Sequence, residues 1–241
     1  MKTIDAKGMH FKALNEIIKS AGEDVKIENC LGQRYIGCGL DGIKIDINGI
    51  PGNALGAYLD GAIINVNGNS QDATGDTMNN GTIYIHGSAG DATGYAMRGG
   101  KIFVEGDSGY RTGIHMKAYK DKLPVLVIGG KCGSFLGEYQ SGGIIIVLRE
   151  CMGDEPFHNN FCAAGMHGGK IFIRCKGKPL INSPQLNVDK ASEEDIELIS
   201  PYIQEFCEAF GRDFDKVIKQ DFYVITPNTS NPYKQLYVRN I

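Results

Sequence analysis

Short segments in the middle of the chain alternate apolar and polar residues, a pattern typical of half-buried β-strands. In residues 81–87, Ile83 and Ile85 fall on one side, while a threonine, a tyrosine and a histidine fall on the other. Nineteen positions later, Ile102 and Val104 hold the same two apolar places. The pattern predicts a series of strands that each turn one aliphatic pair inward, with earlier pairs at Ile64 and Val66 and at Ile45 and Ile47.

Glycines recur between the predicted strands with the same period of nineteen. Most strands are followed by the spacing G-x-x-G-x-x-x-G, as at residues 87–94. A fixed period of this size indicates stacked copies of one unit. Glycine suits corners with positive φ, or places where stacked backbones leave no room for a side chain. We therefore expect a structural role for Gly37, Gly49, Gly52, Gly56, Gly68, Gly75, Gly87, Gly90, Gly94, Gly106, Gly109, Gly113, Gly130, Gly133, Gly137 and Gly165.

The length of the period selects one repeat architecture. It is too short for helix-containing repeats such as ankyrin units, and it does not divide into the equal six-residue sides of hexapeptide helices. The regular aspartates of calcium-binding nonapeptide repeats are also missing. We predict an all-β solenoid, a single-stranded right-handed parallel β-helix of about seven coils over residues 24–177.

Both ends of the predicted solenoid carry helical patterns, as exposed solenoid ends should be capped. Residues 1–23 form an N-terminal helical cap, with an amphipathic stripe that includes Phe11 and Leu14. Residues 178–241 form a helical tail that packs on the β-helix. Within it, Ser192 begins a helix with a capping box, Ser200–Pro201 begins a second helix, and Gly211 ends that helix.

Two irregular stretches interrupt the period, at residues 116–122 and 151–161. Loops that leave a regular scaffold commonly carry recognition, although tolerated surface decoration is an equally good explanation. The candidates for partner contact are Lys117, Tyr119, Lys120, Phe157, His158 and Phe161.

Composition and charge narrow the possible partners. The net charge is −3 and no basic face is visible, so nucleic acid is not expected. The longest apolar run, residues 144–148, is far too short to cross a membrane. Seven cysteines form no CxxC pair, and the start shows no signal peptide, so we expect a cytoplasmic protein with reduced thiols. The strands at the two ends of the solenoid have an unpaired edge at which two copies can associate, so a homo-oligomer is an alternative to a monomer.

The histidines suggest no metal centre. His86 and His115 lie twenty-nine positions apart, which is no multiple of the period, so they should not stack. His158, Cys162 and His167 match no zinc-ligand spacing. We predict no metal-binding residue, with zinc at the second group as the weaker alternative.

Other reactive patterns are also missing. Asp72 and Asp91 are in phase and form an exposed row, which we interpret as Asx turns to their own backbone rather than as a cation site. No P-loop or G-x-S-x-G elbow exists, and the glycine pairs do not open a helix after a strand. We therefore predict no catalytic and no cofactor-binding residue.

Several segments resemble one known family. They are residues 4–16 (IDAKGMHFKALNE), 32–37 (GQRYIG), 137–143 (GEYQSGG), 160–169 (NFCAAGMHGG) and 221–227 (DFYVITP). Together with the glycine repeats, they resemble the C-terminal GXGXG domain of the glutamate synthase large (alpha) subunit. In that family, the segment that corresponds to residues 137–143 reads like GEYMTGG, and the segment that corresponds to residues 160–169 reads like NFAAGMSGG. The chain is similar to a stand-alone form of that domain.

The resemblance implies a non-catalytic structural subunit. It would scaffold amidotransferase and FMN-binding synthase subunits in glutamate biosynthesis and help to hold the ammonia passage between them. FMN and iron–sulfur clusters would lie on those partners, because this chain has no clustered cysteine set and no β/α alternation. The amidotransferase would also be a partner, because Lys2 and not a nucleophilic cysteine follows Met1.

Two alternatives remain. The β-helical subunit of formylmethanofuran dehydrogenase is similar in its glycine coils and in a motif like Met97–Ile102 here. An autonomous solenoid enzyme acting on carbohydrate or acyl substrates would need clustered carboxylates or histidines, and the sequence shows none.

Overall fold

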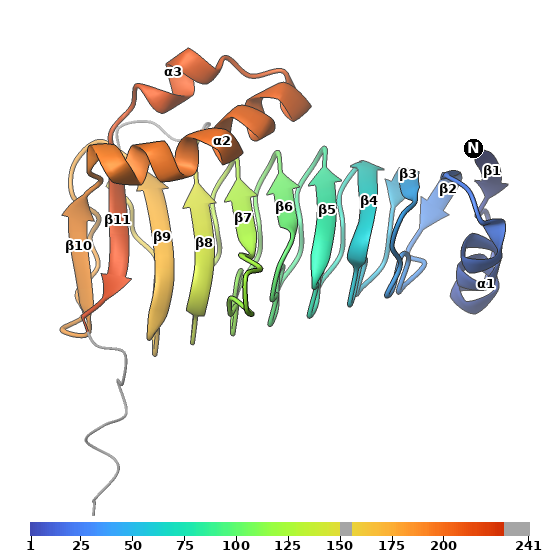
Figure 1. Ribbon diagram of the computed structural model, residues 1–241, viewed down its shortest axis with the longest axis horizontal. Helices are drawn as coiled ribbons and strands as arrows, with labels where there is room; N and C mark the ends of the chain where they lie inside the picture. The colour runs from blue at the N-terminus through green and yellow to red at the C-terminus, as the bar shows by residue number, and fades with distance from the viewer. Residues whose placement is uncertain (150–155, 229–241) are drawn as a thin grey trace, which may run out of the picture.

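The chain folds into an elongated solenoid whose strands lie side by side along its length (Figure 1). The computed structural model describes residues 1–149 and 156–228. Within them lie three helices, α1 (Phe11–Ala21), α2 (Glu193–Phe210) and α3 (Phe214–Ile218). The strands are β1 (Lys2–Asp5), β2 (Val25–Leu31), β3 (Lys44–Ile50), β4 (Asp60–Asn67), β5 (Asn80–Ile85), β6 (Lys101–Val104), β7 (Val125–Ile128), β8 (Ser141–Val147), β9 (Gly168–Arg174), β10 (Leu186–Lys190) and β11 (Phe222–Pro227).

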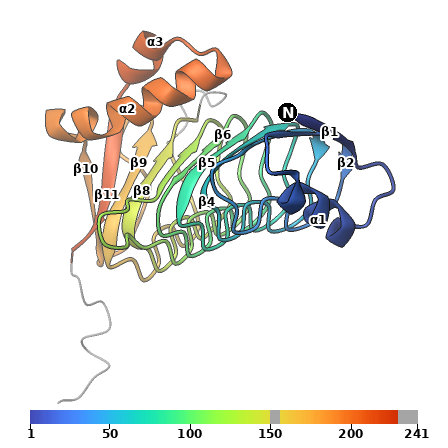
Figure 2. The ribbon, with the colours of Figure 1, turned by 45° about the vertical axis from the view of Figure 1, so that its right-hand side comes forward.

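One sheet joins all these strands in the order β1-β2-β3-β4-β5-β6-β7-β8-β9-β11-β10. Neighbours from β1 to β9 are parallel, and Ile64 pairs with Ile45 and with Ile83 one period away on either side. Figure 2 shows the connecting turns stacked in register along the solenoid. The predicted all-β solenoid is confirmed, with about eight turns from β2 to β9 where about seven were expected. Its hand and the division of the chain at residues 23 and 177 stay predictions.

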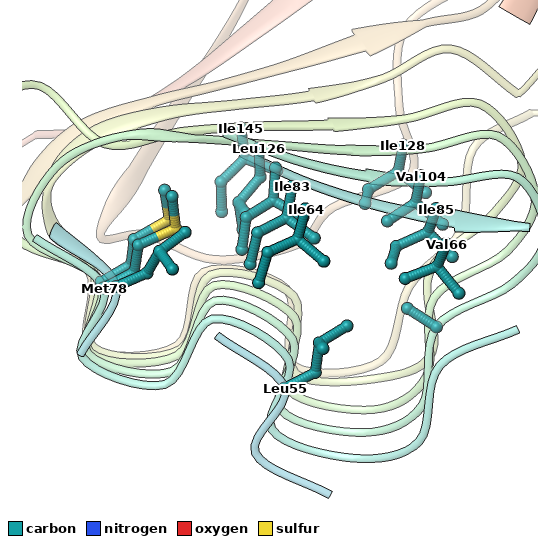
Figure 3. Close-up of a cluster of buried hydrophobic side chains, with 14 of the residues drawn as sticks. Leu55, Ile64, Val66, Met78, Ile83, Ile85, Val104, Leu126, Ile128 and Ile145 are labelled. Carbon is teal, nitrogen blue, oxygen red and sulfur yellow. The ribbon is translucent and has the colours of Figure 1, made fainter. Parts of the chain in front are cut away.

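The main core lies inside the solenoid and consists of columns of equivalent positions. Figure 3 shows one column that contains Ile64 and Ile83 and a second that contains Val66 and Ile85. All four side chains are completely buried, as are the next members of both columns. The inward pairs predicted from the alternation are therefore confirmed, because parallel pairing in register places each pair on the one before.

A second core lies outside the solenoid, between α2 and the outer face of the sheet (Figure 1). Phe103 of β6 and Ile146 of β8 are completely buried there against α2 residues that include Phe206. This burial was not expected for Phe103, which alternates with Ile102 and so faces away from the interior. Because α2 covers them, β7 and β8 are apolar on both faces, unlike the earlier strands.

The boundaries of α2 agree with the sequence at both of its ends. Ser192 forms a capping box with Asp195, and Gly211 ends the helix in the left-handed conformation, as Gly22 does for α1. The predicted start of a second helix at Ser200–Pro201 is wrong: α2 continues through Pro201, because its buried stripe crosses this point without a break. The tail also contains strands, since residues 222–227 form β11, which pairs antiparallel with β9.

Glycine is required in the coils for two different physical reasons. Gly94 has φ of +72°, and a Cβ atom there would lie 2.8 Å from Leu126 Cδ1 inside the core. The same inward position with positive φ is held by Gly37, Gly56, Gly75, Gly113 and Gly137, while Ala163 takes it in the last coil, two residues before Gly165. Gly90 has an ordinary φ, but a Cβ atom there would collide with the Asp72 carboxylate of the preceding coil.

The aspartate row joins neighbouring coils. Asp72 Oδ1 accepts a hydrogen bond from the N–H of Asp91 at 2.9 Å, and Asp91 Oδ1 accepts one from the N–H of Tyr110 at 2.8 Å. We expected each side chain to bond its own backbone. The structure differs because coils only ~4.8 Å apart bring the N–H of the next coil within reach. A second row, three positions earlier in each coil, bonds neighbouring coils in the same way, as where Asp107 Oδ1 accepts from the N–H of Lys131.

Candidate interaction surface

The corner opposite the sheet is built from residues with a left-handed backbone. In one coil these are Arg111, Gly113 and His115, with φ of +58°, +71° and +56°. The N–H groups of Arg111 and His115 bond carbonyls of the next coil, and that of Gly113 bonds a carbonyl of the preceding coil. These bonds between coils satisfy the backbone in both directions and hold the conformation in place. The side chains of Arg111 and His115 are exposed.

Aromatic residues occupy several of these left-handed positions. Phe135, Tyr139 and Phe161 have φ of +65°, +54° and +58°. This conformation costs an L-residue about 1–2 kcal/mol, a cost that glycine would avoid. Burial does not offset it, because Tyr139 is 38% exposed and Phe161 67% exposed. Strained, exposed aromatic side chains therefore mark this corner as a candidate functional surface.

Together with Tyr95, whose own φ is not positive, these side chains form two rows along the solenoid, which we call row one and row two. In row one, the Arg111 guanidinium lies 4.7 Å from the centre of the Phe135 ring, and Phe135 stacks on Phe161 at 4.8 Å. In row two, Tyr95 contacts His115 edge-on at 6.0 Å, and His115 stacks on Tyr139 at 5.0 Å. In the two stacked pairs, Phe135 with Phe161 and His115 with Tyr139, the rings cover each other's faces, which suits a protein partner better than a ligand that inserts between rings.

The predicted contact residues of the first irregular stretch lie on an exposed turn before β7. Tyr119 is 47% exposed, and its backbone bonds that of Lys122 in both directions. The Lys120 ammonium lies 5.3 Å from the centre of the Tyr119 ring. Lys117 is also exposed. These residues are accessible, and their role in contact stays a prediction.

The second irregular stretch differs from the expectation at Phe157. This residue is only 4% exposed, and the Arg149 guanidinium lies 5.6 Å from the centre of its ring, so it packs into the molecule instead of presenting its ring to a partner. His158 is exposed, and Phe161 ends row one. The part of the predicted loop at residues 151–155 lies outside the described residues.

Three of the described cysteine thiols are poorly suited to chemistry. Burial raises the pKa of the Cys30 thiol to about 11 and that of the Cys162 thiol to about 12, and it also raises the pKa of Cys132. Since the thiolate is the nucleophile and metal ligand, these thiols are unreactive at neutral pH. In residues 1–149 and 156–228, no group of three or more His, Cys, Asp or Glu side chains is placed to hold a metal ion.

A polar cleft of about 400 Å³ lies where α2 meets the sheet, lined by residues that include Tyr84, His86 and Glu205. The Tyr84 hydroxyl donates to Glu205 Oε1 at 2.8 Å, and Lys101 Nζ donates to the same oxygen at 2.6 Å. Burial, together with the hydrogen bond to Glu205, raises the pKa of Tyr84. The His86 ring packs edge-on against Phe210. These side chains fasten α2 to the sheet.

Among the described residues, no helix is both long enough and apolar enough to cross a membrane.

Comparisons with known proteins agree with the solenoid fold. The family model for the GXGXG motif matches residues 12–231. An uncharacterized protein of Methanocaldococcus jannaschii is 46% identical over an alignment that covers 99% of this chain and 97% of its own length. A chain in the crystal structure of the formyltransferase/hydrolase complex of Methylorubrum extorquens, solved with methylofuran, superposes with a TM-score of 0.62. It is 18% identical, and the match covers 92% of this chain and 89% of that one.

Proposed function

The chain belongs to the GXGXG motif family, and from this premise we propose that it is a non-catalytic β-helical subunit that scaffolds the catalytic subunits of a larger enzyme. The single observation that carries the proposal is the pair of aromatic rows. Except for Tyr95, their members keep a strained left-handed backbone, and Tyr139 and Phe161 also keep exposed rings, although neither feature contributes to the core. A role as a docking surface explains both features, since aromatic residues and arginine are the side chains most enriched at the centres of protein interfaces.

The partners we propose first are the amidotransferase and FMN/iron–sulfur subunits of a glutamate synthase in the cytoplasm. The support comes from the residues that resemble that family. Tyr139 lies in the segment 137–143, and Phe161 lies in the segment 160–169. Two of the segments that carry the resemblance, including the most specific one at 160–169, thus contribute to the proposed docking surface.

A second candidate is the β-helical subunit of a formylmethanofuran dehydrogenase-like complex. The observation that favours it is the superposition on a chain of the formyltransferase/hydrolase complex over most of both lengths. Both candidates assign the same scaffolding role to this chain, and they differ in the partners that it holds.

Affinity purification from the organism that encodes the protein, at native expression level and followed by mass spectrometry, tests the proposal. We expect catalytic subunits to co-purify with the unmodified chain. Tyr139→Ala should lower their recovery by about 10-fold or more, as expected for an interface residue worth about 2 kcal/mol.

Tyr58→Ala is the matched control, because Tyr58 also has a left-handed backbone and is 54% exposed, but it lies four coils before Tyr139. Its recovery of partners should equal that of the unmodified chain. Purification of the chain without any enzyme partner, or equal losses in the two variants, would contradict the proposal. The identity of the recovered subunits decides between the two complexes.

A further inference from the structure

The sheet has a free edge at the N-terminal end of the solenoid, formed by β1. Among the described strands, β1 comes first in the sheet order and pairs with β2 alone. The N–H groups of Lys2 and Ala6 bond carbonyls in β2 or directly before it. Backbone groups along a strand alternate in direction, so the N–H and C=O groups of Thr3 and Asp5 point away from β2. They form a row of donors and acceptors that can pair with another strand.

The apolar interior is closed at the same end. α1 lies below β1 (Figure 1), and its Leu14 and Ile18 side chains are buried in one core with Ile4. The amino group of Met1 bonds the carboxylate of Glu23, directly before β2, so it lies on the β2 side of the strand. An open strand edge beside a covered core suits a partner that supplies a strand rather than one that supplies an apolar surface.

The sequence of β1 is self-complementary in an antiparallel pair centred on Ile4. Thr3 then lies opposite Asp5 of a second copy, and the backbone groups that face the free edge form hydrogen bonds in both directions. The Thr3 hydroxyl can donate to the same carboxylate, and the two Ile4 side chains meet on the inner side of the sheet. A pair centred on Thr3 would instead place Lys2 opposite the inward-facing Ile4. We propose that two copies of the chain pair through β1 in the register centred on Ile4.

Two exposed apolar side chains flank the free edge. Leu31 is 78% exposed. It lies beside the end of β1, because Gln33 Oε1 accepts from the N–H of Leu31 and Gln33 Nε2 donates to the carbonyl of Ala6. Met1 is 65% exposed and precedes the start of β1. An antiparallel pair brings the start of one β1 to the end of the other, so Met1 of each copy approaches Leu31 of the other and apolar surface leaves water.

The two ends of the solenoid differ, and this difference limits the assembly to two copies. The far edge of the sheet is β10, which joins it through the antiparallel strand β11. Pairing of β1 with β1 follows a two-fold axis and uses the free edge of both copies, so it closes as a dimer. Pairing of β1 with β10 would repeat from copy to copy and form an open filament.

A dimer through β1 leaves the aromatic rows accessible. The row residues lie between β5 and β9, from Tyr95 to Phe161, and not at the N-terminal edge. A dimer therefore presents two sets of rows, and in the proposed scaffold role it holds two sets of catalytic subunits. The pairing itself uses no row residue and does not depend on that role.

Sedimentation velocity of the full chain tests the inference at concentrations up to about 1 mM, because pairing of one short strand is a small interface. We expect a monomer that converts to a dimer as the concentration rises. Thr3→Pro removes a donor at the free edge and keeps the bonds to β2. It should raise the dissociation constant of the dimer by about 100-fold, since each dimer loses two backbone hydrogen bonds. Thr3→Ser keeps the N–H and the hydroxyl and should leave the constant unchanged.

Lys190→Pro is the matched control at the other edge. The N–H of Ala191 bonds β11, so that of Lys190 points to the free edge of β10. This variant should dimerise like the unmodified chain. Amide hydrogen exchange followed by NMR gives a readout that needs no substitution. Protection of the Thr3 and Asp5 amides should rise with protein concentration, whereas that of Ile4, whose N–H faces β2, should not.

Any of four results would overturn the inference. They are a monomer at every concentration, a dimer unaffected by Thr3→Pro, an equal loss of dimer in Lys190→Pro, and species that grow beyond the dimer. Thermal unfolding followed by circular dichroism checks that both proline variants fold, and the exchange measurement decides the matter if Thr3→Pro does not. The experiments contain no partner enzyme, so failure here is separable from failure of the proposed scaffold role.

Discussion

At the scale of single residues, Gly94 shows two reasons why a solenoid corner needs glycine: a left-handed backbone and a lack of space for a side chain. Its φ is +72°, and a Cβ atom would lie 2.8 Å from Leu126 Cδ1. Gly42 has φ of +60° but no atom within 4 Å of the same imaginary Cβ. The first position therefore needs glycine for its conformation and for space, and the second for conformation alone.

We expect Gly94→Val to lower the free energy of unfolding by about 3 kcal/mol or more, since strain adds to overpacking. Gly42→Val should cost about 1–2 kcal/mol from strain alone. Urea unfolding followed by circular dichroism measures both. Equal losses in the two variants would show that crowding by Leu126 has no effect.

Gln140 is the polar exception in an interior column of methionines. Aligned positions of neighbouring coils are occupied by Met97, Met116 and Met166. Gln140 is completely buried, and its Nε2 donates to the carbonyls of residues 142 and 143. Its Oε1 has no hydrogen-bond partner within the described residues.

Gln140→Met should raise the free energy of unfolding by about 1 kcal/mol, because it removes a buried unsatisfied acceptor. The reverse change, Met97→Gln, should lower it by about 2 kcal/mol because it buries an amide in an apolar column. Calorimetric unfolding of both variants checks the pair. A loss of stability in Gln140→Met would mean that its two hydrogen bonds outweigh the unpaired oxygen.

At the scale of elements, α2 shows what a sequence pattern can predict and what it cannot. The apolar stripe that includes Ile203, Phe206 and Phe210 predicts a helix with one buried face, and all three side chains are buried. The pattern does not say what covers that face. The partner is the outer side of β5 to β9 and of β11, and it is reached through pairs such as Tyr84 and Glu205, which lie far apart in the sequence.

Phe206→Ala should cost about 3–5 kcal/mol, the usual range for a fully buried phenylalanine. It should also increase binding of a hydrophobic dye, because α2 then covers the outer sheet face less well. Leu198 of α2 is 39% exposed, so Leu198→Ala is the control and should change stability little. A similar small effect in both variants would contradict the role of α2 as the cover of this face.

At the scale of the whole molecule, the aromatic rows depend on contacts between stacked coils that the residue spacing does not reveal. Arg111, Phe135 and Phe161 occupy one corner position in successive coils, yet their spacings are twenty-four and twenty-six positions rather than nineteen. The irregular stretches absorb the difference outside the corner, so the register of the stack is kept. A search for residues in phase therefore misses both rows. The signal that was present is aromatic residues two positions before or after a corner glycine, as at Phe135 and Tyr139 around Gly137.

The sequence by itself determined the repeating part of this protein. The solenoid, its inward aliphatic columns and the capping box at Ser192 all follow from patterns that are local or recur in every regular coil, so each coil repeats the same physical demand. Only the tertiary structure decided the rest: the covering of Phe103 by α2, the burial of Phe157, and the stacking of Phe161 on Phe135 in row one. Each of these depends on contacts between segments that share no period, and such contacts are set by packing in three dimensions.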